Sequence, residues 1–376
     1  MAKMSKAFET NQYRNLFAEY GYDEAEIQNR MKNIWETIFF GNDDEKFYFE
    51  VGDDMGFVTD TGNHDVRSEG QSYAMMAAVQ MDNKDVFDRV WKWTKTYMWL
   101  PEGKNAGYFA WSVGLDGEKN SWGPAPDGEL FFAMALFFAA NRWGNGEGIF
   151  NYTKEAKDVL HAMVHNEEPM YNPENKLIKF VPNMEISDPS YHCAHFHELF
   201  ALWANEEDRD FFKEAAKASR DYLVTACHPI TGLNPEYANY DGTPFVGREH
   251  HHLFYSDSYR VAINIGLDHM WFGANPELTK AMERQQTFFY ETNPGELGDY
   301  AYEVDGNRIE DFMVLHPVGL LATNAAASLA TDIDASRFFV EKFWNTPLRT
   351  GDRRYYDNFL YLFSFMALSG NYKIYK

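Results

Sequence analysis

Residues 24–39 read EAEIQNRMKNIWETIF, and this stretch shows the pattern that dominates the whole chain. Apolar side chains recur three or four positions apart, so that on a helix they form a single stripe of Ile27, Met31, Ile34, Trp35 and Ile38. Strand-like alternation of apolar and polar residues is sparse. The stripe therefore predicts a helix that buries one face against a neighbouring element.

The same helical periodicity continues to the end of the chain. Further helices are predicted at residues 69–81, 84–97, 129–143, 153–165, 191–205, 209–227, 256–271, 276–290, 314–330, 335–344 and 355–368. Tight connections alternate with long ones that are rich in Gly, Asp, Pro and aromatic residues, at 98–128, 166–190, 228–255 and 291–313.

Twelve helices in six hairpins of about 63 residues each predict an all-α fold, an (α/α)6 barrel. Inner and outer helices alternate in such a barrel, and the long loops gather at one end to line a cleft. The helix count alone leaves a helical protein of another topology as the alternative. No change in composition divides the chain, so we expect one domain over residues 1–376.

The charge balance argues against two classes of partner. The chain has 57 Asp and Glu against 34 Lys and Arg, a net charge of −23, whereas nucleic acids and anionic membranes are bound by clustered basic residues. No apolar run is long enough for a membrane span, and the first ten residues lack the apolar core of a secretory signal, so a cytoplasmic location is expected. Cys193 and Cys227 make no disulfide framework and are expected to be buried thiols.

Aromatic residues make up 17% of the chain, and many of them are Tyr or Trp. Part of this set must be core, because aromatic side chains bury large areas. The other aromatic residues, together with the excess of Asp and Glu, suit a groove for neutral, hydroxyl-rich ligands. Sugar rings stack on aromatic faces, and sugar hydroxyls donate to carboxylates.

Three acidic residues stand where a loop enters a predicted helix. Glu69 opens one such helix two residues after Arg67, and Asp127 precedes another. Asp257 lies in an aromatic segment, with Arg260 one turn later. Each also has a structural explanation, because a carboxylate at a helix start caps the backbone or meets the helix dipole, and Asp257 with Arg260 is an i,i+3 ion pair. The functional alternative is a group of carboxyl groups at the cleft end of the barrel.

The loop before Asp127 carries Trp111 and Trp122 among glycines and polar residues. Two indoles are hard to bury in such a loop, so exposed platforms for sugars are weighed against burial in the core. Glycoside hydrolysis needs two carboxyl groups that flank the scissile bond, one protonated and one ionised. The acidic residues and the tryptophans fit that chemistry.

Two longer segments make this pattern recognisable. Residues 68–73 read SEGQSY, and residues 125–143 place an alanine four positions before Trp143. On these segments the chain resembles glycoside hydrolase family 8, whose members are inverting enzymes with an (α/α)6 barrel that act on β-1,4-linked backbones. The chain departs from the family signature at Pro126, Glu129 and Phe132, which surround Asp127 without replacing it.

Within the family, the resemblance is to members that release xylose from the reducing end of xylo-oligosaccharides, and it runs nearly end to end. The matching segments follow one another in the same order, at residues 107–111, 120–129, 187–192, 256–261, 315–320 and 354–358.

The resemblance implies a role for each acidic residue. Glu69 is expected to be the general acid and Asp257 the general base, with Asp127 in contact with the distorted sugar at the cleavage subsite. Burial or the nearby Asp127 should then raise the pKa of Glu69, and Arg260 should keep Asp257 ionised. An inverting pair needs a gap of about 6.5–9.5 Å for the attacking water.

The resemblance also implies the residues that bind the substrate. Tyr191 would help to hold the attacking water, and Arg260 would orient Asp257 or the sugar. Trp111 and Trp122 would be stacking platforms, and Arg67, beside Glu69, is expected to bind the substrate. His316 would belong to a loop that blocks the cleft on the reducing-end side.

Two histidine-rich segments superficially resemble metal sites. His192, His195 and His197, with Glu198, lack the paired i,i+4 histidines of a zinc protease helix, and residues 249–252 read EHHH. We expect both to be polar residues of the cleft or the surface, with no metal and no cofactor.

The leading hypothesis is an exo-acting oligoxylanase with a xylo-oligosaccharide substrate, no nucleic-acid or membrane partner, and a monomeric or weakly homo-oligomeric state. An endo-xylanase or another endo-glycanase of the same family is the first alternative. A sugar epimerase is disfavoured because such enzymes rely on paired histidines, and a carbohydrate-binding protein is disfavoured because it needs no acid–base pair.

Overall fold

The computed structural model describes residues 6–273, 275–292, 297 and 300–376. Part of the predicted loop at 291–313 and the first five residues lie outside this set. The described residues form an (α/α)6 barrel, so the predicted fold class is confirmed. Its inner helices are α4 (Ser68–Gln80), α6 (Pro126–Trp143), α8 (Ala194–Trp203), α10 (Arg260–Phe272), α12 (Pro317–Ala326) and α14 (Arg354–Leu368).

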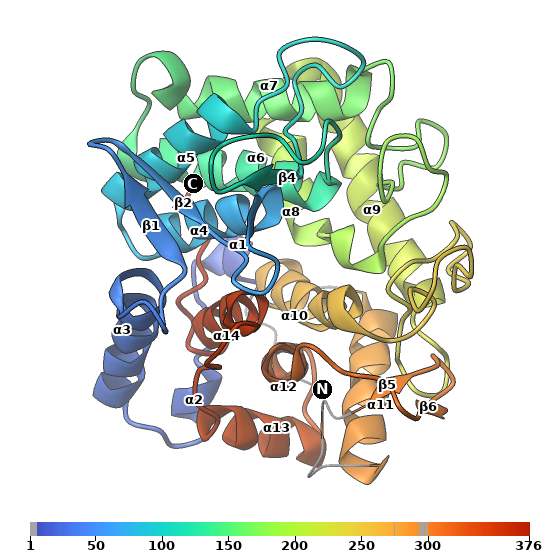
Figure 1. The fold of residues 1–376 in the computed structure, drawn as a ribbon. Helices are drawn as coiled ribbons and strands as arrows, with labels where there is room; N and C mark the ends of the chain where they lie inside the picture. The colour runs from blue at the N-terminus through green and yellow to red at the C-terminus, as the bar shows by residue number, and fades with distance from the viewer. Residues whose placement is uncertain (1–5, 274, 293–296, 298–299) are drawn as a thin grey trace.

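The outer helices surround this inner set (Figure 1). They are α3 (Glu24–Phe40), α5 (Lys84–Tyr97), α7 (Tyr152–His165), α9 (Arg209–Ala226), α11 (Pro276–Thr292) and α13 (Asp334–Trp344). Each of the twelve predicted helices has a counterpart here. The short helices α1 (Ala7–Thr10) and α2 (Leu16–Glu19) precede them.

Burial separates the two rings of helices. Every residue of α14 is buried, whereas α5 and α9 bury only one face. An inner helix packs against neighbours on all sides, so its sequence lacks a polar stripe, while an outer helix keeps the amphipathic pattern seen at 24–39. In the described part of the chain, no helix is both long and apolar enough to cross a lipid bilayer.

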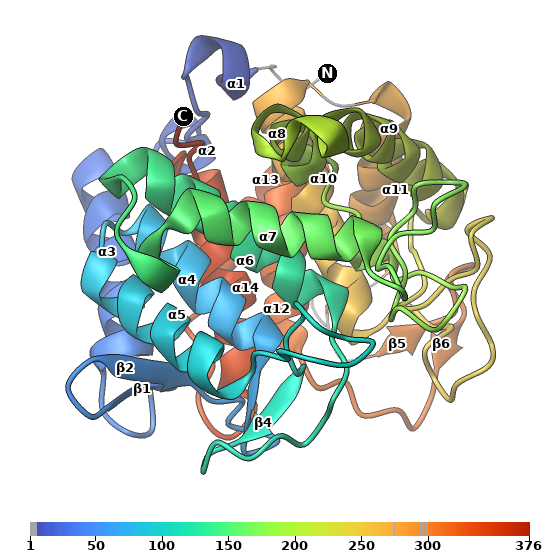
Figure 2. The ribbon, with the colours of Figure 1, turned by 90° about the horizontal axis from the view of Figure 1, so that it is seen from above.

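The strands and long loops gather at one end of the barrel, opposite α1 and the C-terminus (Figure 2). Three antiparallel pairs occur there: β1 (Tyr48–Val51) with β2 (Met55–Val58), β3 (Asp65–Arg67) with β4 (Ser112–Gly114), and β5 (Ala301–Tyr302) with β6 (Arg308–Ile309). The register pairs Arg67 with Ser112, and Ser68 N–H donates to the carbonyl of Trp111 at 3.0 Å. This pairing brings the tryptophan loop to the start of α4.

Three predicted helices begin later than the periodicity indicated. The turns of 3₁₀ helix at Pro189–Tyr191 and Ser256–Tyr259 precede α8 and α10, and α12 begins only at Pro317. Proline lacks a backbone N–H and restricts the residue before it, so it favours the first turn of a helix and disfavours its interior. Pro317 explains the late start of α12, while α8 and α10 follow 3₁₀ turns. Tyr191, Asp257 and His316 lie in these entry turns, outside the regular α-helices.

Candidate active site

A cleft opens where α4 and α6 begin and where the entry turns of α8 and α10 lie. Six of the nine predicted site residues line it: Arg67, Glu69, Trp111, Asp127, Tyr191 and Asp257. Helix N-termini carry a partial positive charge, which favours acidic side chains at this end of the inner helices.

Glu69 lies in the first turn of α4, and its side chain is 15% exposed. The Tyr355 hydroxyl donates to Oε1 at 2.9 Å, and Arg260 Nη1 donates to Oε2 at 3.4 Å. The Tyr355 ring reaches Glu69 because residue 70 is glycine, since a Cβ there would lie 2.5 Å from the Tyr355 hydroxyl oxygen. Burial raises the pKa of Glu69 to about 8, helped by the charge of Asp127 and opposed by Arg260.

Asp127 lies in the first turn of α6 and is buried. Its Oδ2 accepts from Arg260 Nη1 at 2.8 Å, and its Oδ1 accepts from Gly128 N–H at 2.9 Å. A Cβ at residue 128 would lie 2.6 Å from Ser68 Oγ, so glycine allows α4 and α6 to approach closely where they begin. Burial raises the pKa of Asp127, against the opposing effect of Arg260.

Asp257 lies in the entry turn of α10, and its side chain is 26% exposed. Ser256 before it has a φ of 43°, a left-handed conformation that is uncommon for residues other than glycine and is often found at functional sites. Asp257 Oδ1 accepts from the Tyr356 hydroxyl at 3.1 Å and lies 3.3 Å from Arg260 Nη2. The carboxylate is therefore held from two sides while part of it stays open to solvent.

Arg260 joins these carboxyl groups from the first position of α10. One nitrogen, Nη1, donates to Asp127, to Glu69 and to the Tyr73 hydroxyl, and the other, Nη2, faces Asp257. Nη2 and Nε are buried and have no hydrogen-bond partner among the described residues. The guanidinium group of Arg260 thus contacts both carboxyl groups of the expected acid–base pair. Its Nη2 and Nε remain available to donate hydrogen bonds.

The remaining predicted residues differ in how closely they approach this centre. The Arg67 guanidinium lies 5.5 Å from the ring centroid of Trp111, and both residues line the cleft. The ring of Tyr191 lies 5.6 Å from the Arg260 guanidinium. Trp122 is 71% exposed and lies outside the cleft lining, so the structure does not bring it to the acidic residues.

His316 reaches the site through an aromatic neighbour. It is the residue before α12, and its ring packs edge-on against Tyr356 with centroids 4.7 Å apart. Tyr356 in turn donates to Asp257. His316 Nδ1 lies 3.5 Å from Asp357 Oδ2, and Nε2 has no hydrogen bond to any described residue.

Several residues that were given no role from the sequence also contact the acidic residues or Arg260, among them Tyr73. Tyr355 and Tyr356 fall within the quoted segment 354–358, so their position signalled them. Asp188 is buried 3.8 Å from Arg260 Nη2, within the quoted segment 187–192. Glu236 has no local signal, because it is one glutamate in the loop at 228–255.

Glu236 lies directly behind Asp257. Its Oε1 accepts the backbone N–H of Asp257 at 3.3 Å, and its Oε2 lies 2.5 Å from His251 Nδ1. Burial raises the pKa of Glu236 to about 7, against the opposing effect of His251. His251 of the EHHH run therefore supports the loop that carries Asp257.

The other histidine-rich segment was interpreted wrongly as polar cleft or surface residues. His192, His195 and His197 are buried, because they lie on and just before the inner helix α8. Ser219 bonds to Nδ1 of both His192 and His197, at 3.0 and 3.2 Å. Burial lowers the pKa of all three histidines, that of His197 to about 3, so they are residues of the core. Cys193 and Cys227 are buried free thiols, as predicted.

Comparison with known proteins defines the class. The family model described as glycosyl hydrolases family 8 matches residues 34–369, and the chain belongs to this family. The chain is 60% identical to a protein of Halalkalibacterium halodurans named reducing end xylose-releasing exo-oligoxylanase, over 98% of this chain and 96% of the relative. A protein of the same name from Bifidobacterium adolescentis is 49% identical, over 98% of this chain and all of the relative.

Solved structures of similar proteins have the same fold as this chain. A crystal structure of a reducing end xylose-releasing exo-oligoxylanase superimposes with a TM-score of 0.96 at 57% identity, covering 99% of this chain and 100% of the other. A structure of such an enzyme complexed with xylose gives a TM-score of 0.95 at 59% identity, covering 98% and 99%.

Proposed function

We propose that this glycosidase is an inverting enzyme that releases xylose from the reducing end of β-1,4-linked xylo-oligosaccharides. The observation that carries the proposal is the placement of Glu69 and Asp257 against opposite nitrogens of Arg260, in unlike surroundings. Glu69 is the more buried carboxyl group, with a pKa of about 8, whereas Asp257 is more open to solvent. Such a difference is what an acid and a base require of two carboxyl groups. The names of the relatives support the substrate class.

The proposed reaction is a single displacement. Glu69 gives its proton to the glycosidic oxygen while the bond from that oxygen to the anomeric carbon breaks. The oxygen of a water forms the new bond to the same carbon, and Asp257 takes a proton from that water. Tyr191 holds the water, and Asp127 contacts the sugar that is attacked. Water and the two carboxyl groups supply every atom that moves, so the proposal includes no cofactor.

The anomer of the product tests the displacement. Hydrolysis of xylotriose at the bond next to its reducing end gives xylose and xylobiose, and the attacked carbon becomes the reducing end of xylobiose. Water attacks from the face opposite the leaving group, so new xylobiose is expected to form as the α-anomer. Proton NMR in the first minutes, before mutarotation, measures this. Early accumulation of β-xylobiose would contradict both the inversion and the role of Asp257 as base.

The exo specificity is assigned to His316. Its ring is fixed between Tyr356 and Asp357, and Nε2 is left for a ligand. We propose that it binds the reducing-end hydroxyl of the single xylose beyond the cut and so closes the cleft there. Xylotriose is then a good substrate, whereas xylobiose and polymeric xylan react poorly. An endo-glycanase of the same family would need this side of the cleft to be open.

His316→Ala is expected to lower kcat/KM for xylotriose by about tenfold, the equivalent of one lost hydrogen bond. The variant should also release some products longer than xylose from the reducing side of xylopentaose. Chromatography of xylopentaose labelled at its reducing end resolves these products, and His64→Ala, an exposed histidine outside the cleft lining, is the matched control. Unchanged specificity in a folded His316→Ala protein would favour the endo alternative.

A further inference from the structure

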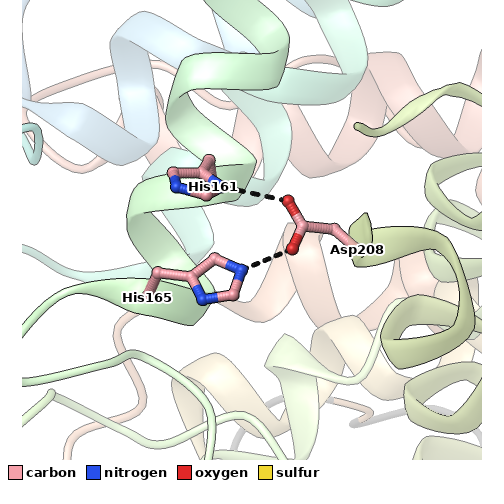
Figure 3. A group of neighbouring side chains, drawn as sticks. All are labelled: His161, His165 and Asp208. Carbon is pink, nitrogen blue, oxygen red and sulfur yellow. Dashed lines mark hydrogen bonds and ion pairs between the residues drawn. The ribbon is translucent and has the colours of Figure 1, made fainter. Parts of the chain in front are cut away.

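A second cluster of chemically active side chains lies outside the cleft lining, between two outer helices. His161 and His165 are four residues apart on α7, so both rings project from one face of the helix. Asp208 comes from the short 3₁₀ turn (Glu206–Asp208) that leads into α9. Figure 3 shows both rings turned toward the two oxygens of this carboxylate.

The distances place three metal-ligating atoms together. His161 Nδ1 lies 3.2 Å from Asp208 Oδ2, and His165 Nε2 lies 2.5 Å from Oδ1. The ligand atoms of the three residues all lie within 4.8 Å of one another. Zinc bonds nitrogen and oxygen ligands at about 2.0–2.2 Å, which puts neighbouring ligand atoms of a tetrahedron about 3.4 Å apart. Each imidazole side chain is 47% exposed, so small ring movements can reach this spacing.

The second observation is the burial of Asp208 and the nature of its partners. Its side chain is 1% exposed, and among the described residues its ion-pair partners are only the two histidines, with no Lys or Arg. A buried carboxylate is costly unless a positive charge compensates it. A divalent cation held by the three side chains would supply that charge.

Asp208 directly precedes α9, and its own backbone is already helical, with φ −97° and ψ −12°. Here the side chain makes no capping hydrogen bond and points to the histidines instead. The carboxylate is therefore directed at the cluster.

We propose that His161, His165 and Asp208 bind one divalent transition-metal ion, best Zn²⁺, which ties α7 to the start of α9. Imidazole and carboxylate ligands suit zinc, nickel and cobalt, and water completes the coordination. Each imidazole binds as the neutral tautomer, with its proton on the other ring nitrogen. The ion joins neighbouring outer helices, so its effect is on stability and it takes no part in hydrolysis.

Isothermal titration calorimetry of tag-free protein with ZnCl2 at pH 7.5 tests the site. One equivalent is expected to bind tightly, and Co²⁺ in its place should give the visible absorption of a tetrahedral N/O site. His161→Gln and His165→Gln should each weaken Zn²⁺ binding at least about tenfold. At free Zn²⁺ about 100 times the Kd, the Tm of the wild type should rise by about 3 °C, and that of the double variant should not.

His250→Gln is the matched control, because it alters the other histidine-rich surface segment. Its Zn²⁺ affinity should equal that of the wild type, and loss of binding in this variant would move the site to residues 249–252 and overturn the proposal. Absence of a one-equivalent site in the wild type, or unchanged binding in both α7 variants, would also overturn it. Asp208→Asn tests the third ligand. If that variant does not fold, the variants of the half-exposed His161 and His165 decide the outcome.

Discussion

Glu69→Gln is expected to lower kcat/KM for xylotriose by about 10²–10⁴-fold, because the amide cannot protonate the leaving oxygen. The replacement keeps the acceptor for the Tyr355 hydroxyl, so the fold should be unchanged by circular dichroism and Tm. Glu129→Gln is the matched control. Glu129 is also a buried carboxyl group whose pKa burial raises to about 8, but it bonds to the backbone of Phe109 and lies outside the cleft lining. Its replacement should leave kcat/KM within a few-fold of wild type.

The pH profile distinguishes an acid from a merely structural residue. Burial raises the pKa of Glu69 to about 8, so wild-type kcat/KM should fall as the pH rises through about 8 and the proton is lost. The residual activity of Glu69→Gln should show no such fall. Asp127→Asn removes a charge that raises this pKa, so the fall should move to lower pH. Turnover within a few-fold of wild type in Glu69→Gln would refute the assignment.

Asp257→Asn is expected to lower kcat by about 10²–10⁴-fold with little change in xylotriose binding, because the base acts on water and leaves the substrate contacts in place. Single-turnover kinetics gives the rate, and calorimetry gives the affinity. The amide can still accept from Tyr356, which limits the structural change.

Tyr356→Phe provides a graded comparison. It removes the hydroxyl that donates to Asp257 and leaves the carboxylate and its contact with Arg260 in place. Its kcat should fall by about tenfold, the equivalent of one hydrogen bond. An Asp257→Asn protein with weakened binding and near-normal kcat would make Asp257 a substrate-binding residue.

The helices of this protein were predictable because their signal is local. The stripe at 24–39 and the mostly apolar helix at 129–143 are set by side chains three or four residues apart, which meet on one helix face. The predicted start is three residues early at Pro317, where proline starts the helix, and four residues early at Arg260, where a 3₁₀ turn precedes the helix.

The candidate acid and base could be named from the sequence because each stands beside a recognisable segment. Arg260 could be predicted as the partner of Asp257, three residues before it, but not as a partner of Glu69, which is 191 residues away. Glu236 gives no sequence signal at all, and it reaches Asp257 only through the folding of the loop at 228–255. The spacing of His161 and His165 is visible in the sequence, but the carboxylate between them belongs to another hairpin.

The helices and their order could be predicted from local sequence patterns, and the barrel and its three acidic residues from these patterns together with the family resemblance. Tertiary structure alone decided that these residues share one guanidinium, that the pKa of Glu69 is raised to about 8, and that Asp208 faces two imidazoles. The reason is physical: helix formation depends on neighbours within one turn, whereas desolvation and charge depend on every group that packing brings near, at any distance along the chain.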